Sequence, residues 1–165
     1  MPTRGTKKVN FSDWRAPTFI QPKKNRTVIF LSDFRKLNHI FRRKPFPIPK
    51  IQDMLLNLEG FTYASYLNLN MGYYNIELSP GAKHICTIVL LWVKYEYQKL
   101  PMEVCNSPNI LQENISKLFE GFDMLRAHID DVLVSTTNNF KDNIKALYRV
   151  LQRLVEEGLK VNAEN

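Results

Sequence analysis

The chain has 165 residues, of which 44% are hydrophobic and 24% are charged, a balance that indicates a folded domain rather than a disordered segment. No apolar run could span a bilayer and the basic N-terminus is unlike a signal peptide, so we expect an intracellular protein whose compartment stays open. The formal net charge of +7 favours a polyanionic partner, although a basic surface can also serve solubility alone. Cys86 and Cys105 form neither a disulfide framework nor a metal-ligand spacing.

The N-terminal part of the chain is predicted to contain two strands. Residues 1–13 are polar and basic, and we expect them to be loose. The composition of Pro17–Lys23 and Thr27–Ser32 indicates strands, with a polar turn at Lys24–Arg26 between them. An irregular basic connector, rich in proline, follows at Arg42–Pro49.

The middle of the chain is predicted to contain a helix, a strand and a hairpin. Pro49 is typical of the first turn of a helix, and Gly60 can end that helix. A strand at Tyr63–Leu69 and a β-hairpin formed by Thr87–Leu91 and Tyr95–Leu100 follow. One face of the helix would carry the apolar residues Ile51, Met54, Leu55 and Leu58.

Two adjacent carboxylates stand out after the next helix, which is predicted to begin at Ser107–Pro108 and end at Gly121. Short strands at Leu125–Ile129 and Val132–Ser135 flank Asp130–Asp131. A tight turn between these strands would bring both carboxylates to one exposed tip, which suits a hard divalent cation. Asp is also common in ordinary turns, so the pair alone does not decide between the two interpretations.

A final helix is predicted before Gly158. Its expected apolar face consists of Phe140, Ile144, Leu147, Leu151 and Leu154. Strands and helices alternate irregularly along the whole chain, which predicts an α+β fold rather than a doubly wound sheet.

Six segments, in chain order, match a single set of motifs: Ser32–Asn38, Pro45–Leu55, Tyr66–Ile76, Tyr95–Gln112, His128–Val134 and Glu157–Glu164. They resemble the motifs DFRxLN, YPLPxIxDLL, LDLxxGYHQI, xMPFGLxNAPxxFQ, YLDDILI and xGLxLNxEK of the reverse transcriptases of gypsy-like LTR retrotransposons. One such match would be weak, but six with the family's order and spacing are specific.

The resemblance implies a right-hand polymerase fold, in which an antiparallel sheet packs on helices, with fingers and a partial palm over residues 14–165. It also implies an RNA-directed DNA polymerase that takes an RNA or DNA template–primer and deoxynucleotides. In an intact polyprotein we expect a third palm segment, a thumb, RNase H and integrase to follow. Whether the chain is part of such a polyprotein or a stand-alone relic stays open.

The resemblance further implies a metal site that is altered in this chain. The family uses three aspartates, which hold two Mg²⁺ ions; two correspond to Asp130 and Asp131, and the third corresponds to Asn68. An amide oxygen can ligate a metal but carries no charge, and no spare carboxylate follows Asn68. We therefore predict a weakened metal site, unless Asn68 is a harmless local variant. The backbone at Asn68 should lie beside the Asp130–Asp131 turn.

Four residues match family positions near the incoming nucleotide. Tyr73 would exclude a ribose 2′-hydroxyl, or it is a core residue easily confused with Tyr74. Gln112 would lie near the template or nucleotide, or it is an exposed helix residue. Lys23 and Lys24 would form the basic tip of the fingers hairpin, or they belong to a solvated turn.

Two further positions depart from the family pattern. Glu103 stands where the family has Gly and would add bulk and negative charge near phosphates. Ile29 stands where relatives usually carry an Arg that grips the triphosphate. Together with Asn68, these residues predict a catalytically impaired reverse transcriptase. The alternative is a non-catalytic nucleic-acid-binding remnant or relic of a transposable element; an Asp-Asp metallohydrolase is disfavoured because clustered His and acidic ligands are absent.

Overall fold

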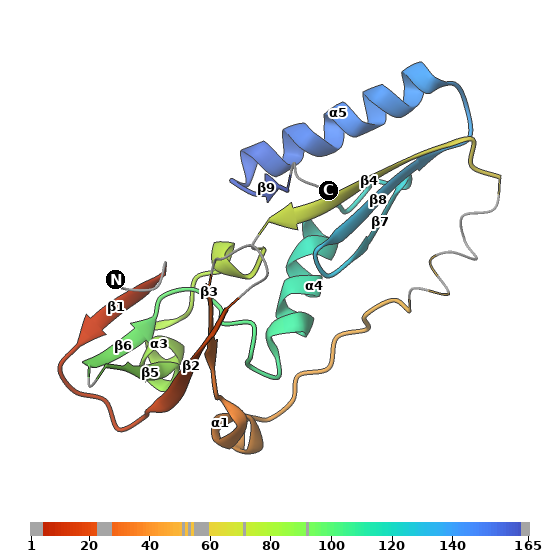
Figure 1. Ribbon diagram of the computed structural model, residues 1–165. Helices are drawn as coiled ribbons and strands as arrows, with labels where there is room; N and C mark the ends of the chain where they lie inside the picture. Colours follow the sequence, from red (N-terminus) through yellow and green to blue (C-terminus); the bar gives the residue numbers. More distant parts are fainter. Residues whose placement is uncertain are drawn as a thin grey trace. The chain divides into compact units, whose positions relative to one another are not determined.

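The computed structural model describes residues 5–22, 28–50, 52, 54, 60–70, 72–91 and 93–162 (Figure 1). Its contacts divide the chain into two compact units, each made of two separate stretches of sequence. The first unit comprises Met1–Arg43 and Tyr73–Ser107, and the second comprises Lys44–Gly72 and Pro108–Asn165. Each unit is built on its own sheet.

The first unit contains a five-stranded sheet with the strand order β1-β6-β5-β2-β3. Its strands are β1 (Thr6–Val9), β2 (Ala16–Pro22), β3 (Val28–Ser32), β5 (Thr87–Leu90) and β6 (Val93–Tyr97). Neighbouring strands are antiparallel except β2 and β5, which are parallel. The strands predicted at Pro17–Lys23 and Thr27–Ser32 are confirmed over their described residues, as is the predicted hairpin around residues 87–100. The predicted turn at Lys24–Arg26 lies outside the described residues.

The expectation of a loose N-terminus was wrong for Thr6–Val9. These residues form β1 and pair with β6, with Thr6 opposite Tyr97 and Val9 opposite Lys94. Lys7 and Lys8 on this strand are exposed. A polar strand can occupy a sheet edge through backbone hydrogen bonds alone, so its composition resembles that of a loose segment.

Two short helices of the first unit, α1 (Arg35–Ile40) and α3 (Pro80–Ile85), were not predicted, because six residues are too few to show a helical period. Asp33 holds the start of α1, since its carboxylate accepts hydrogen bonds from the Arg35 backbone N–H at 3.1 Å and from the Arg35 guanidinium at 2.6 Å. These bonds lower the pKa of Asp33 to about 2. Phe34 and Leu37 are buried in a core that also contains Ala16, Cys86, Ile88, Tyr97 and Val104.

Leu91, just after the end of β5, adopts an unusual backbone conformation. Leu91 has a φ of 49°, whereas Val93 already belongs to β6. Left-handed backbone is unfavourable for a side chain such as leucine, so the hairpin holds its turn against a local conformational cost.

The second unit contains a four-stranded antiparallel sheet with the strand order β7-β8-β4-β9. Its strands are β4 (Tyr63–Asn70), β7 (Leu125–His128), β8 (Asp131–Thr136) and the short β9 (Lys160–Val161), and its long helices are α4 (Ser107–Leu118) and α5 (Phe140–Glu156). These elements confirm the strands and helices predicted between residues 63 and 156. Of the helix predicted after Pro49, only Gln52 and Met54 are described, and both are helical; Ile51, Leu55 and Leu58 lie outside the described residues.

One face of the second sheet is buried, and the other carries the exposed side chains of Tyr66 and Asp131. Helix α5 lies along β4 and β8 (Figure 1), with the Ser65 hydroxyl donating to Asn143 at 2.8 Å and the rings of Tyr63 and Phe140 packed edge to face. Val132 and Val134 lie on this face and are fully buried. Because side chains alternate along a strand, Asn68 and Asp131 lie on the opposite face.

The buried face of α5 agrees with the predicted one at Leu154, and in part at the half-buried Leu147 and Leu151, but differs elsewhere. Asn143, Ala146, Val150 and Leu154 are buried, whereas Phe140 and Ile144 are 58% and 46% exposed. Asn143 takes a core position because its amide satisfies Ser65 and the Tyr63 carbonyl, which no hydrophobic pattern reveals. In the described part of the chain, the helices lack the length and apolar composition needed to cross a bilayer.

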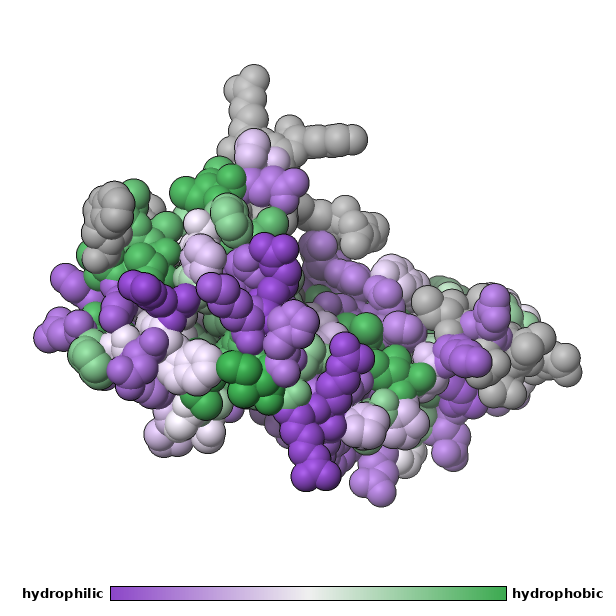
Figure 2. Space-filling view, turned by 90° about the horizontal axis from the view of Figure 1, so that it is seen from below, coloured by the Kyte–Doolittle hydropathy of each residue, from purple (hydrophilic) through white to green (hydrophobic). Residues whose placement is uncertain are grey.

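Large apolar side chains remain at the surface in both units, among them Phe19, Ile20, Tyr148 and Val155. On the face drawn in Figure 2, hydrophobic and hydrophilic areas alternate. Scattered apolar side chains are normal for a folded domain and do not by themselves mark a binding surface.

Two valines on α5 provide a test of which face is buried. We expect Val150→Ala to lower the free energy of unfolding by about 2 kcal/mol, because Val150 is 0% exposed and the substitution leaves a cavity. The same substitution at Val155, which is 75% exposed, should change it by less than about 0.5 kcal/mol. Urea unfolding measures both, and equal losses would contradict the helix orientation.

Candidate functional site

The candidate site begins at the β7–β8 hairpin, which carries both carboxylates. His128 lies opposite Asp131, so Ile129 and Asp130 make the turn. Ile129 has a φ of 55°, a left-handed conformation that a β-branched residue rarely adopts. A surrounding structure must therefore hold this turn, and strained backbone of this kind is common at functional sites.

Asn68 lies beside the two aspartates, as the sequence predicts. In the antiparallel pairing of β4 with β8, Asn68 is opposite Asp131. The Leu69 N–H donates to the Asp130 carbonyl at 2.7 Å, which ties β4 to the turn itself. Residues separated by about sixty positions in the sequence are thus neighbours across two strands.

The other edge of β4 is held by β9, which was not predicted because it has only two residues. Leu69 pairs with Val161, and the Asn162 N–H donates to the Asn68 carbonyl at 2.8 Å. The Asn68 carbonyl is therefore hydrogen-bonded to the chain just after β9, and the neighbouring Leu69 N–H is hydrogen-bonded to the β7–β8 turn. The segment that resembles xGLxLNxEK gains a structural role, which is to fix this strand.

The Asp131 carboxylate is bonded to two donors of the same chain. Its Oδ1 accepts from the Tyr66 hydroxyl at 2.5 Å and from the Asn68 Nδ2 at 2.9 Å. The bond to Asp131 raises the pKa of the Tyr66 phenol. Sequence reasoning missed Tyr66, although its position two residues before Asn68 on a strand places both side chains on one face.

Asp130 occupies a more enclosed position than Asp131. Its Oδ1 is buried and, among the described residues, finds no hydrogen-bond partner. Burial, and secondly the neighbouring charge of Asp131, raise the pKa of Asp130. A Cβ at Gly72 would approach this oxygen to 2.7 Å, so only glycine leaves room for Asp130 as it stands.

The candidate metal ligands of this site are two carboxylates and one amide. In the described ranges, no three His, Cys, Asp or Glu side chains gather where they could hold a metal. Asp130 and Asp131 are oxygen ligands of the hard type that Mg²⁺ prefers, but Asn68 directs a donor nitrogen at Asp131. Among the described residues the site therefore offers two carboxylates, where the resemblance implies three.

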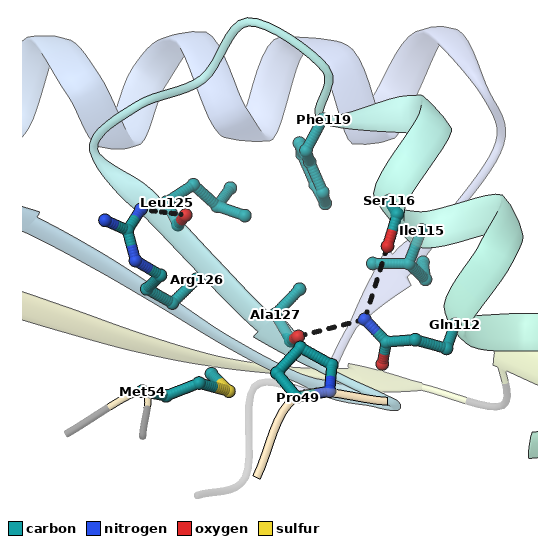
Figure 3. Close-up of a pocket in the computed structure, with 9 residues that line it drawn as sticks. All are labelled: Pro49, Met54, Gln112, Ile115, Ser116, Phe119, Leu125, Arg126 and Ala127. Carbon is teal, nitrogen blue, oxygen red and sulfur yellow. Dashed lines mark hydrogen bonds between the residues drawn. The ribbon is translucent and has the colours of Figure 1, made fainter. Parts of the chain in front are cut away.

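Gln112 on α4 holds the strained turn. Its side chain is 1% exposed; Oε1 accepts from the Ile129 N–H at 2.7 Å and Nε2 donates to the Ala127 carbonyl at 3.1 Å. Figure 3 shows the amide between α4 and β7, at one wall of a pocket of about 310 Å³ that also exposes Ser116 and Arg126. The alternative of an exposed helix residue was wrong. The buried position also favours a positioning role over the predicted contact with template or nucleotide.

The remaining predicted residues belong to the first unit. Tyr73 lies half-buried in the 3₁₀ helix η1 (Gly72–Asn75), and its gate role stays a prediction. Ile29 is in β3, paired with Gln21, but its side chain is outside the described part, as are Lys23 and Lys24.

The side chain of Glu103 is half-buried. Its carboxylate accepts from the Ser32 N–H at 3.5 Å, and burial raises its pKa. Asn38 holds the backbone around it, donating to the Glu103 carbonyl at 3.0 Å and accepting from the Cys105 N–H at 2.9 Å. The Asn of the DFRxLN-like segment thus fixes the loop before α4.

We expect Gly72→Ala to displace the Asp130 side chain. The added methyl group would meet Oδ1 at 2.7 Å, and this oxygen ends a rotatable side chain, so Asp130 should turn at a cost of about 1 kcal/mol. The carboxyl ¹³C resonance of Asp130 and urea unfolding measure the two effects. Gly81→Ala, where a Cβ meets nothing within 4 Å, is the control and should leave both unchanged or raise stability slightly. An unmoved Asp130 resonance in Gly72→Ala would refute the steric argument.

Known proteins match this chain along almost its whole length. A family model described as "Reverse transcriptase (RNA-dependent DNA polymerase)" matches residues 7–164. The retrovirus-related Pol polyprotein from transposon 412 of Drosophila melanogaster is 29% identical over 164 residues, which cover 93% of this chain and 13% of that protein. That from transposon gypsy of the same organism is 27% identical over 167 residues, covering 93% and 16%.

A solved structure shows the same fold. The foamy viral protease-reverse transcriptase in complex with an RNA/DNA hybrid superposes with a TM-score of 0.87 at 21% identity, covering 96% of this chain and 21% of that chain. The likeness confirms the predicted α+β polymerase fold, in which sheets pack on helices. This chain spans less than a quarter of the length of each of these three proteins. The chain belongs to the reverse transcriptase (RNA-dependent DNA polymerase) family, and its relatives are retrotransposon Pol polyproteins.

Proposed function

We propose that this chain is the fingers-and-palm part of a retrotransposon reverse transcriptase that binds template–primer nucleic acid but extends a primer very slowly. The observation that carries the proposal is the contact between Asn68 and Asp131. An amide stands at the position of a family aspartate and directs its Nδ2 at the remaining carboxylate. The fold around the site supports the assignment to a polymerase, and the neutral amide at Asn68 supports the proposed loss of catalytic rate.

The reaction of the family is nucleotidyl transfer onto a primer 3′-hydroxyl, with pyrophosphate as the leaving group. Divalent cations held by carboxylates supply the charge stabilisation that this reaction needs. Two carboxylates and a neutral amide hold less negative charge than three carboxylates. A loss of several kcal/mol of transition-state stabilisation corresponds to a rate loss of roughly 10³ or more.

Two other residues add to the proposed impairment. Ile29 cannot donate the bidentate hydrogen bonds that an arginine gives to a triphosphate. Glu103 adds a carboxyl group where the family has glycine. One oxygen of this carboxyl group accepts a hydrogen bond from the Ser32 N–H, so that oxygen is partly satisfied within the protein. Tyr73 is proposed to select deoxynucleotides, and Lys23 and Lys24 to approach the nucleotide from the fingers hairpin.

The net positive charge of the chain and the ligand of a structurally similar protein support nucleic acid as the partner. The chain carries a formal charge of +7, and the foamy viral relative was solved with an RNA/DNA hybrid. Arg42 and Arg43 are exposed in the connector, where no ion pair engages them among the described contacts. Basic side chains of this kind bind phosphates without regard to base sequence.

We expect weak binding to an RNA/DNA hybrid that falls steeply with salt. Replacing Arg42 and Arg43 by Gln should lower the affinity and reduce the slope of log K against log salt by up to about 2, because two phosphate contacts are lost. The charge-matched control is Lys117→Gln with Lys145→Gln, since both lysines already pair with acids on their own helices. Fluorescence anisotropy at several KCl concentrations measures the slope. Affinity independent of salt would refute the proposed partner.

Primer extension tests the proposed impairment. The chain is fused to the downstream palm and thumb segments of a gypsy-like relative and compared with Asn68→Asp, Glu103→Gly and Ile29→Arg combined in the same fusion. We expect the combined variant to extend a primer with Mg²⁺ and deoxynucleotides, and the parent to be slower by roughly 10³ or more. Asn68→Asp alone should recover little, because Glu103 and Ile29 remain.

The fusion separates the two candidate functions. The relative's own fingers and palm, joined to the same downstream segments, show that the fusion point permits synthesis. If the parent fusion extends a primer as fast as the combined variant, the protein is an ordinary polymerase domain that tolerates an amide at Asn68. A parent that binds the hybrid without extending it supports the non-catalytic binding remnant.

A further inference from the structure

Tyr66 lies on the face of the second sheet opposite α5, next to the candidate site. Its side chain is 56% exposed, yet its hydroxyl donates to the Asp131 Oδ1 at 2.5 Å. Tyr66 and Asn68 are two residues apart on β4, so both side chains lie on the face that carries Asp131. A short bond to a carboxylate is the strong, charge-assisted type.

The two donors together satisfy one oxygen of Asp131. A carboxylate oxygen has two lone pairs, and Tyr66 and Asn68 supply one hydrogen each. A carboxylate that binds a cation would present these lone pairs to the metal instead. In this chain the negative charge of Asp131 is met by donors of its own strand pair.

We propose that Tyr66 and Asn68 form a donor cap on Asp131, which takes the place of a cation and competes with one for this carboxylate. The cap holds Asp131 next to Asp130 without any metal. A divalent cation that binds Asp131 through Oδ1 must first displace the Tyr66 hydroxyl. This inference rests on the proposed function in one respect, which is that the ligand competing for Asp131 is a divalent cation.

The competition predicts a specific gain from removing the hydroxyl. Tyr66→Phe keeps the ring and deletes only the donor, and because the ring is largely exposed the substitution should not disturb folding. The cation then no longer displaces a charge-assisted hydrogen bond. We expect the dissociation constant for Mn²⁺ to fall by about tenfold.

The test is a titration of the full chain with Mn²⁺, followed by the electron paramagnetic resonance signal of the free ion. Four proteins are compared: the natural chain, Tyr66→Phe, Asn68→Asp, and the two substitutions combined. Tyr63→Phe is the matched control, because Tyr63 lies on the same strand but on the opposite face, packed on Phe140. It should bind Mn²⁺ like the natural chain, and circular dichroism confirms that each variant is folded.

The outcomes separate the cap from the proposed impairment. Tighter Mn²⁺ binding in Tyr66→Phe, both alone and in the Asn68→Asp background, supports the cap. Unchanged dissociation constants in both backgrounds overturn it, even where Asn68→Asp binds Mn²⁺ more tightly than the natural chain. If the natural chain already binds Mn²⁺ as tightly as Asn68→Asp does, the weakened metal site of the proposed function fails, while the Tyr66→Phe comparison still decides on the cap.

Discussion

The antiparallel register of β4 with β8 is the constraint on which the candidate site depends. It places Asn68 opposite Asp131 and joins Leu69 to the carbonyl of Asp130. A shift of one residue would send Asn68 to the helix-covered face, because side chains alternate along a strand. The register is specified by burial, since Val132 and Val134 must lie beneath α5. The same burial therefore stabilises the second unit and orients the residues of the site.

The contacts that support the site do not depend on the side-chain charge at position 68. Gln112 bonds the strained Ile129, Gly72 leaves room for Asp130, and the Asn162 N–H bonds the Asn68 carbonyl. These contacts involve backbone atoms or steric space, and none depends on the charge at position 68. An aspartate can therefore be replaced by an amide of similar shape without loss of the fold. The proposed impairment is therefore compatible with an intact fold, because the fold and the charge of the site rest on different properties of the same residues.

Several motif residues gain a structural explanation that family membership alone does not supply. Asp33 and Arg35 hold the start of α1, while Asn38 bonds the loop at Glu103 and Cys105. Gln112 acts in the same way on the Asp130–Asp131 hairpin. Amide side chains suit this task because each offers a donor and an acceptor to two backbone groups. Because Asn38 and Gln112 both act in this way, we infer that many motif residues hold the backbone in place rather than take part in the reaction.

The sequence by itself determined the family, the α+β class, most strands and helices, and the neighbourhood of Asn68 with the two aspartates. These depend on local patterns or on motif order, which a single chain carries. Only the tertiary structure decided the β1 and β9 pairings, the buried face of α5, the enclosed position of Gln112 and the contact of Tyr66 with Asp131. Each of these arises from a partner distant in sequence. A polar strand or a buried amide has no hydrophobic period, so its place becomes visible only when the residue that bonds it is known.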